Sequence, residues 1–201
     1  ETFKKYYKDK HTPSGININL RGIKCFLLWA VDEEHIKRMP KIKLLQVDKT
    51  KPKIINDATW NNLMNLTDID EYWLDVFKLY RDTGMRRSEG ILGRIDGSFL
   101  IVKAEHSKSG IEKEIPLSEK QIDVVKEMHK RRNKHLSNGY NITHFKNQFT
   151  KMFKMACNKI GVDYSFHSLR HTFAVRRYYQ TKDLYLVCKE LGHSSITTTE
   201  V

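Results

Sequence analysis

The sequence predicts a mainly α-helical fold that includes one small antiparallel β-sheet. Hydrophobic residues recur at steps of three and four in several segments, which is the period of an amphipathic helix. Between Asp96 and Ile115 that period gives way to turn signals and short alternating runs, which are typical of strands. Hydrophobic residues make up 39% of the 201 residues, enough for one core, which argues against a disordered chain.

The first 36 residues predict one helix after a polar, basic start. Pro13-Ser14-Gly15 is read as a break, and a helix is expected over about 17–34. Arg21 and Lys24 lie outside its apolar stripe. The stripe is formed by Ile23, Phe26, Leu27, Ala30 and Val31. The opening ETFKKYYKDK has no apolar stretch behind its charges, so it is not a signal peptide. No apolar run approaches the roughly 20 residues of a membrane span.

Residues 37–56 are expected to form a basic linker. They are rich in lysine, contain Pro40 and Pro52 and show no helical period. Such a segment suits either a solvated tether or a strap lying along DNA.

The main domain is expected over residues 57–201. Asp57 is a plausible N-cap for a short helix through Leu63, and the next helix ends at Thr83-Gly84, where glycine suits a left-handed cap. The second helix shows one apolar face, formed by Trp73, Val76, Phe77 and Tyr80. A further short helix follows through Ile91 and Leu92.

The predicted sheet is built around two turns. Asp96-Gly97 reads as a tight turn before a strand at Phe99–Val102. Ser107-Lys108-Ser109-Gly110 is a second turn, and residues 112–115 alternate as the return strand.

The last third of the chain predicts four helices. Ser118 and Gln121 form a capping box before a helix that ends in the basic run 130–134. A long helix closed by Gly161 follows, and segments 167–180 and 183–191 also read as helices. The buried face of the long helix comprises Phe145, Phe149, Met152, Phe153, Ala156 and Ile160.

Charge and cysteine content narrow the possible partners. The formal net charge is +12, which points to a polyanion, usually nucleic acid. Cys25, Cys157 and Cys188 are far apart and form no CxxC pair, so they are read as reduced core thiols of a cytosolic protein.

Two arginines are candidate phosphate ligands. A phosphodiester under attack becomes a pentavalent, more negative centre, and two guanidinium groups grip its oxygens better than one lysine. Arg86 follows a helix end, with Glu89 one turn later as its expected ion-pair partner, and Arg170 lies in His167-Ser168-Leu169-Arg170. Each arginine by itself would also suit a surface charge.

Three further residues have acid–base potential. His167 and Arg170 are three apart and project from one side of a helix. His193 follows Gly192, which would allow a sharp backbone turn, and Lys108 lies at a hairpin tip. Two histidines and a mobile lysine near a phosphate could donate hydrogen bonds or move protons.

Together these motifs resemble the tyrosine recombinases of the phage integrase family. The family boxes are matched by Thr83-Gly84-Met85-Arg86-Arg87-Ser88-Glu89, by the Lys108 hairpin followed by Ile115-Pro116-Leu117, by residues 167–174, which include His171, and by residues 191–195. The match covers about residues 57–201. It implies the catalytic-domain fold of that family, and residues 1–36 look like the end of its preceding helical core-binding domain.

The resemblance implies a chemistry and a set of roles. A tyrosine would attack a DNA phosphate, giving a 3′-phosphotyrosyl link and a free 5′-hydroxyl. Arg86 and Arg170 would stabilise the transition state, His167 would assist proton transfer, His193 would bond the phosphate and Lys108 would be the general acid. No metal or cofactor is expected. The family spacing places the tyrosine nine residues after His193, just past Val201, so the chain is expected to lack the nucleophile and the C-terminal tail and to bind DNA without cleaving it.

The expected partner is double-stranded DNA, bound by a homotetramer in the intact protein and by a monomer of this chain. The expected location is the cytoplasm, in association with the nucleoid, for a protein encoded by a bacterium, an archaeon or a phage. The expected DNA contacts are Arg21, Lys24, Lys49, Lys51, Lys53, Arg87, Lys130, Arg131 and Arg132.

Two other classes stay open on the residues alone. A non-catalytic helical DNA-binding module would explain the charge and the helices but not the ordered motifs. A metal-dependent nuclease would need a carboxylate cluster, and none is visible in the sequence. Within the recombinases, the motifs do not distinguish an integrase from a chromosome-dimer resolvase or a transposase.

Overall fold

The computed structural model describes residues 2–7, 10–48, 51–107 and 109–192. The chain divides into two compact units, Glu1–Thr50 and Lys51–Val201. Lys49, Lys108 and His193 lie outside the described residues. Within the described part, no helix is both long and apolar enough to cross a membrane.

The first unit contains two helices, α1 (Thr2–Tyr7) and α2 (Pro13–Asp32). The predicted break at Pro13 is wrong, because Pro13 instead occupies the first turn of α2, where its missing N–H costs nothing. Thr12 caps the helix, and its hydroxyl accepts a hydrogen bond from the Gly15 N–H at 3.2 Å. The helix therefore begins four residues before the expected start.

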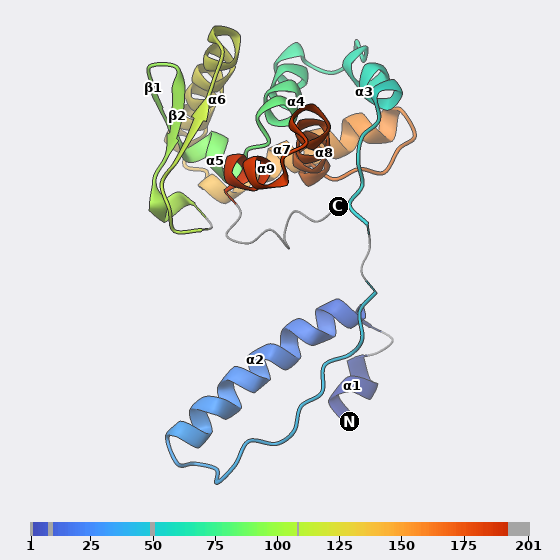
Figure 1. Ribbon diagram of the computed structural model, residues 1–201, viewed down its shortest axis with the longest axis vertical. Helices are drawn as coiled ribbons and strands as arrows, with labels where there is room; N and C mark the ends of the chain where they lie inside the picture. The colour runs from blue at the N-terminus through green and yellow to red at the C-terminus, as the bar shows by residue number, and fades with distance from the viewer. Residues whose placement is uncertain (1, 8–9, 49–50, 108, 193–201) are drawn as a thin grey trace. The chain divides into compact units, whose positions relative to one another are not determined.

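The segment after α2 returns along that helix (Figure 1). The buried side chain of Asn17 donates to the Leu45 carbonyl and accepts from the Leu45 N–H, both at 2.8 Å. Ile16 and Leu20 are buried, whereas Phe26, which was expected on the buried face, is 61% exposed. A polar anchor that the apolar stripe did not reveal therefore sets which face of α2 is covered.

The second unit begins with α3 (Asp57–Met64) and α4 (Glu71–Thr83). Asn56 caps α3 by accepting from the Thr59 N–H at 2.8 Å, so the assignment of Asp57 as the cap was one residue late. Ahead of α3, the Ile55 N–H donates to the buried Thr172 hydroxyl at 3.0 Å. The predicted linker is thus bonded to the first unit at Leu45 and to the second unit at Ile55.

The core of the second unit surrounds α4. The other helices are α5 (Arg87–Leu92), α6 (Glu119–Ser137), α7 (Ile142–Lys159), α8 (His167–Thr181) and α9 (Leu184–Leu191). Phe77 of α4 meets Phe153 of α7 edge to face, with ring centroids 5.0 Å apart, and Tyr80 meets Phe166 at 4.8 Å. These rings are buried, which confirms the aromatic faces predicted for α4 and α7 as core.

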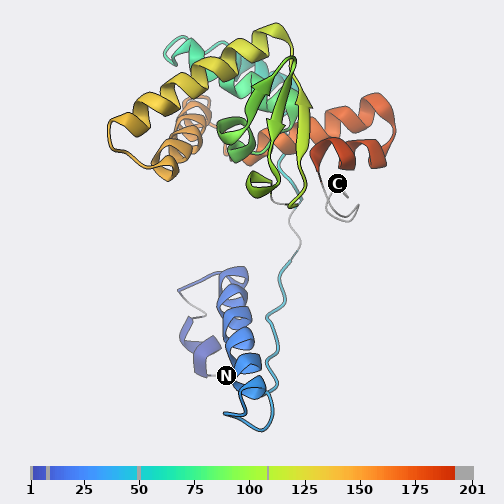
Figure 2. The ribbon, with the colours of Figure 1, turned by 90° about the vertical axis from the view of Figure 1, so that its left-hand side faces the viewer.

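The sheet has three antiparallel strands, β1 (Arg94–Asp96), β2 (Phe99–Val102) and β3 (Lys113–Pro116), in the order β1-β2-β3. Figure 2 shows them side by side next to α5. Gly97 turns β1 into β2 with φ of +54°, as predicted, and a 3₁₀ turn (Ala104–His106) precedes the second connection. Val102 pairs with Lys113, so the return strand begins one residue later than expected.

Three further expectations can be compared with the structure. The capping box of α6 is present, with Gln121 accepting from the Ser118 N–H at 2.9 Å. The basic run 130–134 does not end α6, which continues to Ser137. Cys157 and Cys188 are buried, but Cys25 is exposed, so it is no core thiol. The mainly helical fold with one small antiparallel sheet is confirmed.

Candidate active site

The site is built on the sharp turn between α4 and α5. Gly84 ends α4 with φ of +62°, a left-handed conformation that glycine adopts at little cost. A Cβ at this position would lie 2.3 Å from the Phe173 ring of α8. The glycine therefore allows both the turn and the close approach of α8, and it places Arg86 at the N-cap of α5.

Glu89 fixes Arg86 from inside the protein. Its carboxylate is fully buried. Oε2 accepts from the Arg86 backbone N–H at 2.8 Å, and Oε1 accepts from Arg86 Nη1 at 2.7 Å. The predicted ion pair is present, and the charge-assisted bonds hold the guanidinium in one orientation.

Arg170 joins three elements. It lies on α8 and is 4% exposed. Nη1 donates to the Gly84 carbonyl and Nη2 to the Leu191 carbonyl, both at 2.7 Å, and Nη1 lies 4.0 Å from Glu89 Oε2. Burial lowers the pKa of Arg170 to about 10, with Arg86 adding to the effect and Glu89 opposing it, so the side chain stays cationic at neutral pH.

His167 lines the same pocket as Arg170. The pocket has a volume of about 320 Å³, and its wall also includes Arg87. The rings of His167 and His171 meet edge to face at 4.6 Å, and burial, with Arg170 nearby, lowers the pKa of His171. The expected shared side of His167 and Arg170 is therefore observed.

Lys113 also belongs to this cluster, although the sequence did not single it out. Its Nζ lies 3.6 Å from Glu89 Oε2, and its side chain is 12% exposed. Burial lowers its pKa to about 8, Glu89 opposes this, and Arg170 and Arg86 add to it. Strand alternation puts Lys113 on the same face as the buried Ile115, but no local signal indicates that Glu89 is its partner.

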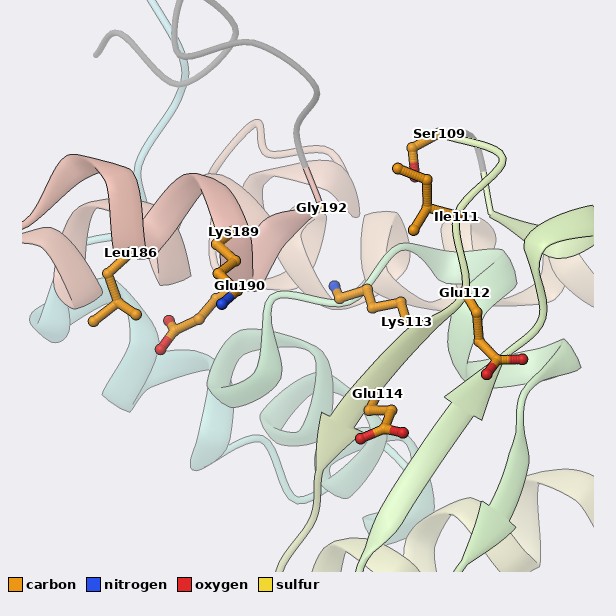
Figure 3. A pocket seen from close by; sticks show the side chains of 9 residues that line it. All are labelled: Ser109, Ile111, Glu112, Lys113, Glu114, Leu186, Lys189, Glu190 and Gly192. Atoms are coloured by element: carbon orange, nitrogen blue, oxygen red, sulfur yellow. The ribbon is translucent and has the colours of Figure 1, made fainter.

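A cleft of about 530 Å³ separates β3 from α9 beside this cluster. Figure 3 shows Lys113 reaching from β3 toward Gly192, the C-terminal end of α9. Gly192 has φ of +66°, which agrees with the sharp turn expected there. The two remaining predicted catalytic residues, Lys108 and His193, are not among the described residues.

The predicted DNA contacts behave in two ways. Arg21, Lys24, Lys51 and Lys130 are exposed, and Lys130 also forms an ion pair with Glu127 at 3.8 Å. The others that the structure describes also bond within the protein: Lys53 with Asp163 at 2.6 Å, Arg87 with Thr150 at 2.6 Å, Arg131 with Glu127 at 2.9 Å and Arg132 with the Ile91 carbonyl at 2.6 Å. The guanidinium of Arg131 also lies over the Tyr72 ring at 3.7 Å. These internal bonds compete with phosphate for Lys53 and three of the arginines.

Among the described residues, no group of three or more His, Cys, Asp or Glu side chains is placed to hold a metal ion. The positively charged side chains around Glu89 are those of Arg86, Arg170 and Lys113.

Comparison with known proteins identifies the family. The profile of the phage integrase family matches residues 46–201. The chain belongs to the phage integrase family, that of the tyrosine recombinases. It is 26% identical to tyrosine recombinase XerD of Lacticaseibacillus casei, over all of this chain and 75% of that protein. It is 25% identical to tyrosine recombinase XerA of Pyrococcus furiosus, over 92% of this chain and 68% of that protein.

Solved structures share the fold. A λ integrase dimer bound to a COC′ core site matches with a TM-score of 0.71 and 18% identity, over 98% of this chain and 76% of that one. The Tn1549 transposon integrase in complex with transposon right end DNA matches with a TM-score of 0.68 and 18% identity, over 98% and 77%. The expected recombinase catalytic-domain fold is thereby confirmed.

Proposed function

We propose that the chain carries the phosphate-activating site of a site-specific DNA recombinase that cuts and rejoins DNA through a 3′-phosphotyrosyl intermediate. The observation that carries this proposal is the convergence of Arg86 and Arg170, 84 residues apart in sequence, on the buried carboxylate of Glu89. Two guanidinium groups oriented around one carboxylate suit the non-bridging oxygens of a phosphodiester.

The proposed reaction has two balanced transfers. A tyrosine oxygen forms a bond to phosphorus, and the bond from phosphorus to the 5′-oxygen breaks. Arg86 and Arg170 stabilise the extra negative charge, His167 assists proton transfer and Lys108 gives a proton to the departing 5′-oxygen. His193 donates a hydrogen bond to the phosphate. A 5′-hydroxyl of the partner duplex then reverses the steps, and the covalent link conserves the energy of the diester.

The nucleophile is proposed to lie outside these 201 residues. The family spacing places it nine residues after His193, beyond Val201. Tyr178, Tyr179 and Tyr185 precede His193 and do not fit that spacing. The chain alone is therefore expected to bind DNA without cleaving it.

DNA binding is proposed to use both units. The net charge of +12 and the exposed Arg21, Lys24, Lys51 and Lys130 supply phosphate contacts that position the protein without reading sequence. Residues 1–36 would be the end of a helical core-binding domain, 37–56 a basic linker and 57–201 the catalytic domain. DNA complexes of the Tn1549 and λ integrases support this partner.

Assembly on DNA is proposed to be tetrameric in the intact recombinase, whereas this chain by itself is expected to be a monomer. A λ integrase tetramer bound to a Holliday junction supports the first part. The activity would take place in the cytoplasm, at the nucleoid, for a protein encoded by a bacterium, an archaeon or a phage.

The decisive experiment uses the chain extended through the predicted tyrosine. A suicide DNA substrate carrying a verified target site should yield a covalent protein–DNA adduct, in the presence of EDTA as well. Arg170→Lys should reduce the adduct strongly, because lysine cannot reproduce the two-pronged geometry. Arg176→Lys, an exposed change on the same helix, is the matched control and should form the adduct normally.

The outcomes separate the candidate functions. No adduct from the extended wild type would refute the recombinase proposal. DNA binding without any adduct would favour the DNA-binding module, and loss of cleavage in EDTA would favour a metal-dependent nuclease. An adduct that survives Arg170→Lys unchanged would show that Arg170 does not act in the reaction. Cleavage by the 201-residue chain alone would show that the nucleophile is misplaced.

A further inference from the structure

Lys113 is a buried ammonium group with little to stabilise it. Its Nζ is buried and makes no hydrogen bond within the described part of the chain. At 3.6 Å from Glu89 Oε2, it forms an ion pair with the carboxylate but no short bond. A buried charge without hydrogen bonds lowers stability, so it is found mainly where function requires it.

The positively charged groups around Glu89 outnumber its single negative charge. Arg86 bonds both carboxylate oxygens, and Arg170 lies 4.0 Å from Oε2. One carboxylate and two guanidinium groups leave a net charge of +1, and Lys113 raises it to +2. A phosphodiester carries one negative charge, and its pentavalent transition state carries about two. With Lys113 protonated, the net charge of +2 at the site therefore balances the charge of the transition state.

Lys113 cannot itself grip the phosphate, because its Nζ is covered. It also differs in place from Lys108, which lies five residues earlier at the hairpin tip. Its influence must pass through Glu89, the group it approaches. Lys113 would therefore be a positioning residue and not a further phosphate ligand.

We propose that Lys113 is a positioning residue of the phosphate site, which neutralises Glu89 so that Arg86 and Arg170 direct their positive charge at the DNA phosphate. The inference rests on the proposed recombinase function and deepens it. It ties the sheet to the catalytic arginines, because β3 carries Lys113 and α5 carries Glu89.

The test compares adduct formation by the extended chain in three forms: wild type, Lys113→Met and Lys113→Arg. Methionine keeps the length without the charge and should slow adduct formation by about ten- to a hundredfold, as is typical when a group that orients a site is lost. Arginine should restore part of the rate. Lys189→Met, an exposed lysine lining the same cleft, is the matched control and should react as the wild type does.

Two readouts distinguish this role from a structural one. The slope of DNA affinity against salt should be unchanged in Lys113→Met, because no phosphate contact is lost. The wild-type rate should fall as pH rises above about 8, the pKa of Lys113, and the Lys113→Arg variant should not show that fall, because its guanidinium stays charged. The charged groups that face Lys113 or line its cleft are Glu89, Arg86, Arg170, Lys189, Glu190, Glu112 and Glu114.

Each outcome decides the proposal. A wild-type rate in Lys113→Met, or a Lys113→Arg protein no faster than the methionine variant, would overturn it. If the wild type forms no adduct, the recombinase function fails instead. A double-mutant cycle of Lys113→Met and Glu89→Gln on urea unfolding still tests the pairing in that case, and additive effects would refute it. If the methionine variant does not fold, the pH profiles of wild type and Lys113→Arg decide.

Discussion

Replacing Glu89 by glutamine removes the charge that orders the site while keeping its shape. The side-chain oxygen of glutamine can accept from either the Arg86 N–H or Arg86 Nη1, but its amide nitrogen cannot accept, so one of the two bonds at 2.8 and 2.7 Å is lost. Lys113 and Arg170 also lose their counter-charge. Removing one partner of a buried ion pair costs about 3–5 kcal/mol, so the free energy of unfolding at pH 7 should fall by that amount.

The cost should depend on pH in a defined direction. Burial raises the pKa of Glu89, but Lys113, Arg86 and Arg170 together outweigh it, so the pKa lies below its ordinary value of 4.5. A carboxyl group with a lowered pKa contributes stability that is complete above its unfolded pKa and is lost as pH falls through the folded one. The difference in the free energy of unfolding between wild type and Glu89→Gln should therefore be complete at pH 7 and should shrink below about pH 4.5.

Urea unfolding at several pH values measures this difference, with Glu112→Gln as the control. Glu112 is exposed on the neighbouring strand connection and should change stability by less than about 0.5 kcal/mol. A loss below about 1 kcal/mol at pH 7, or a loss that stays constant down to acid pH, would refute the view that Glu89 is an ionised hub.

Two further substitutions test how the site is assembled. Gly84→Ala should destabilise the protein by about 2–4 kcal/mol through backbone strain and the clash with Phe173. Gly97 has φ of +54° and open space around it, so Gly97→Ala should cost only the backbone strain of about 1–2 kcal/mol. Equal losses of stability in thermal unfolding would contradict the clash. Thr172→Val should lower the free energy of unfolding in urea by about 1–3 kcal/mol, because it leaves the buried Ile55 N–H without an acceptor. Thr172→Ser keeps the hydroxyl and should retain most of the stability. An equal loss of stability in the two variants would mean that the hydroxyl is not the cause. The 201-residue chain should bind duplex DNA with an affinity that falls steeply with salt in a filter or fluorescence assay, and an affinity independent of salt would argue against phosphate contacts.

Local sequence signals predicted those parts of the fold that local interactions determine. The capping box of Ser118 and Gln121, the left-handed end of α4 at Gly84 and the turn at Gly97 depend on neighbours within four residues, and all three are present. The N-cap of α3 was misplaced by one residue because Asn56 and Asp57 are both good caps.

Features that depend on distant segments were not predictable from local pattern. Which face of α2 is covered depends on Leu45, 28 residues away, so Phe26 was wrongly expected to be buried. The pairing of Lys113 with Glu89 of α5 joins positions 24 residues apart, and no local pattern indicates it. The bond from Arg132 to the Ile91 carbonyl of a different helix was likewise not predicted, and the DNA contact of Arg132 stays a prediction. In each case a long-range contact supplies what the local pattern does not show.

The same distinction explains why both arginines and Glu89 could be found from the sequence, whereas the carbonyl groups that hold Arg170 could not. Arg86 and Arg170 lie in motifs, but Arg170 is held by the carbonyls of Gly84 and Leu191, which end α4 and α9. Its guanidinium thus joins the ends of two helices and borders the pocket beside His167. A change at Arg170 should therefore weaken folding as well as the proposed catalysis, so a loss of activity there cannot by itself prove a chemical role. Lys113 offers the cleaner test, because its protonation changes the charge of the site without changing a single residue.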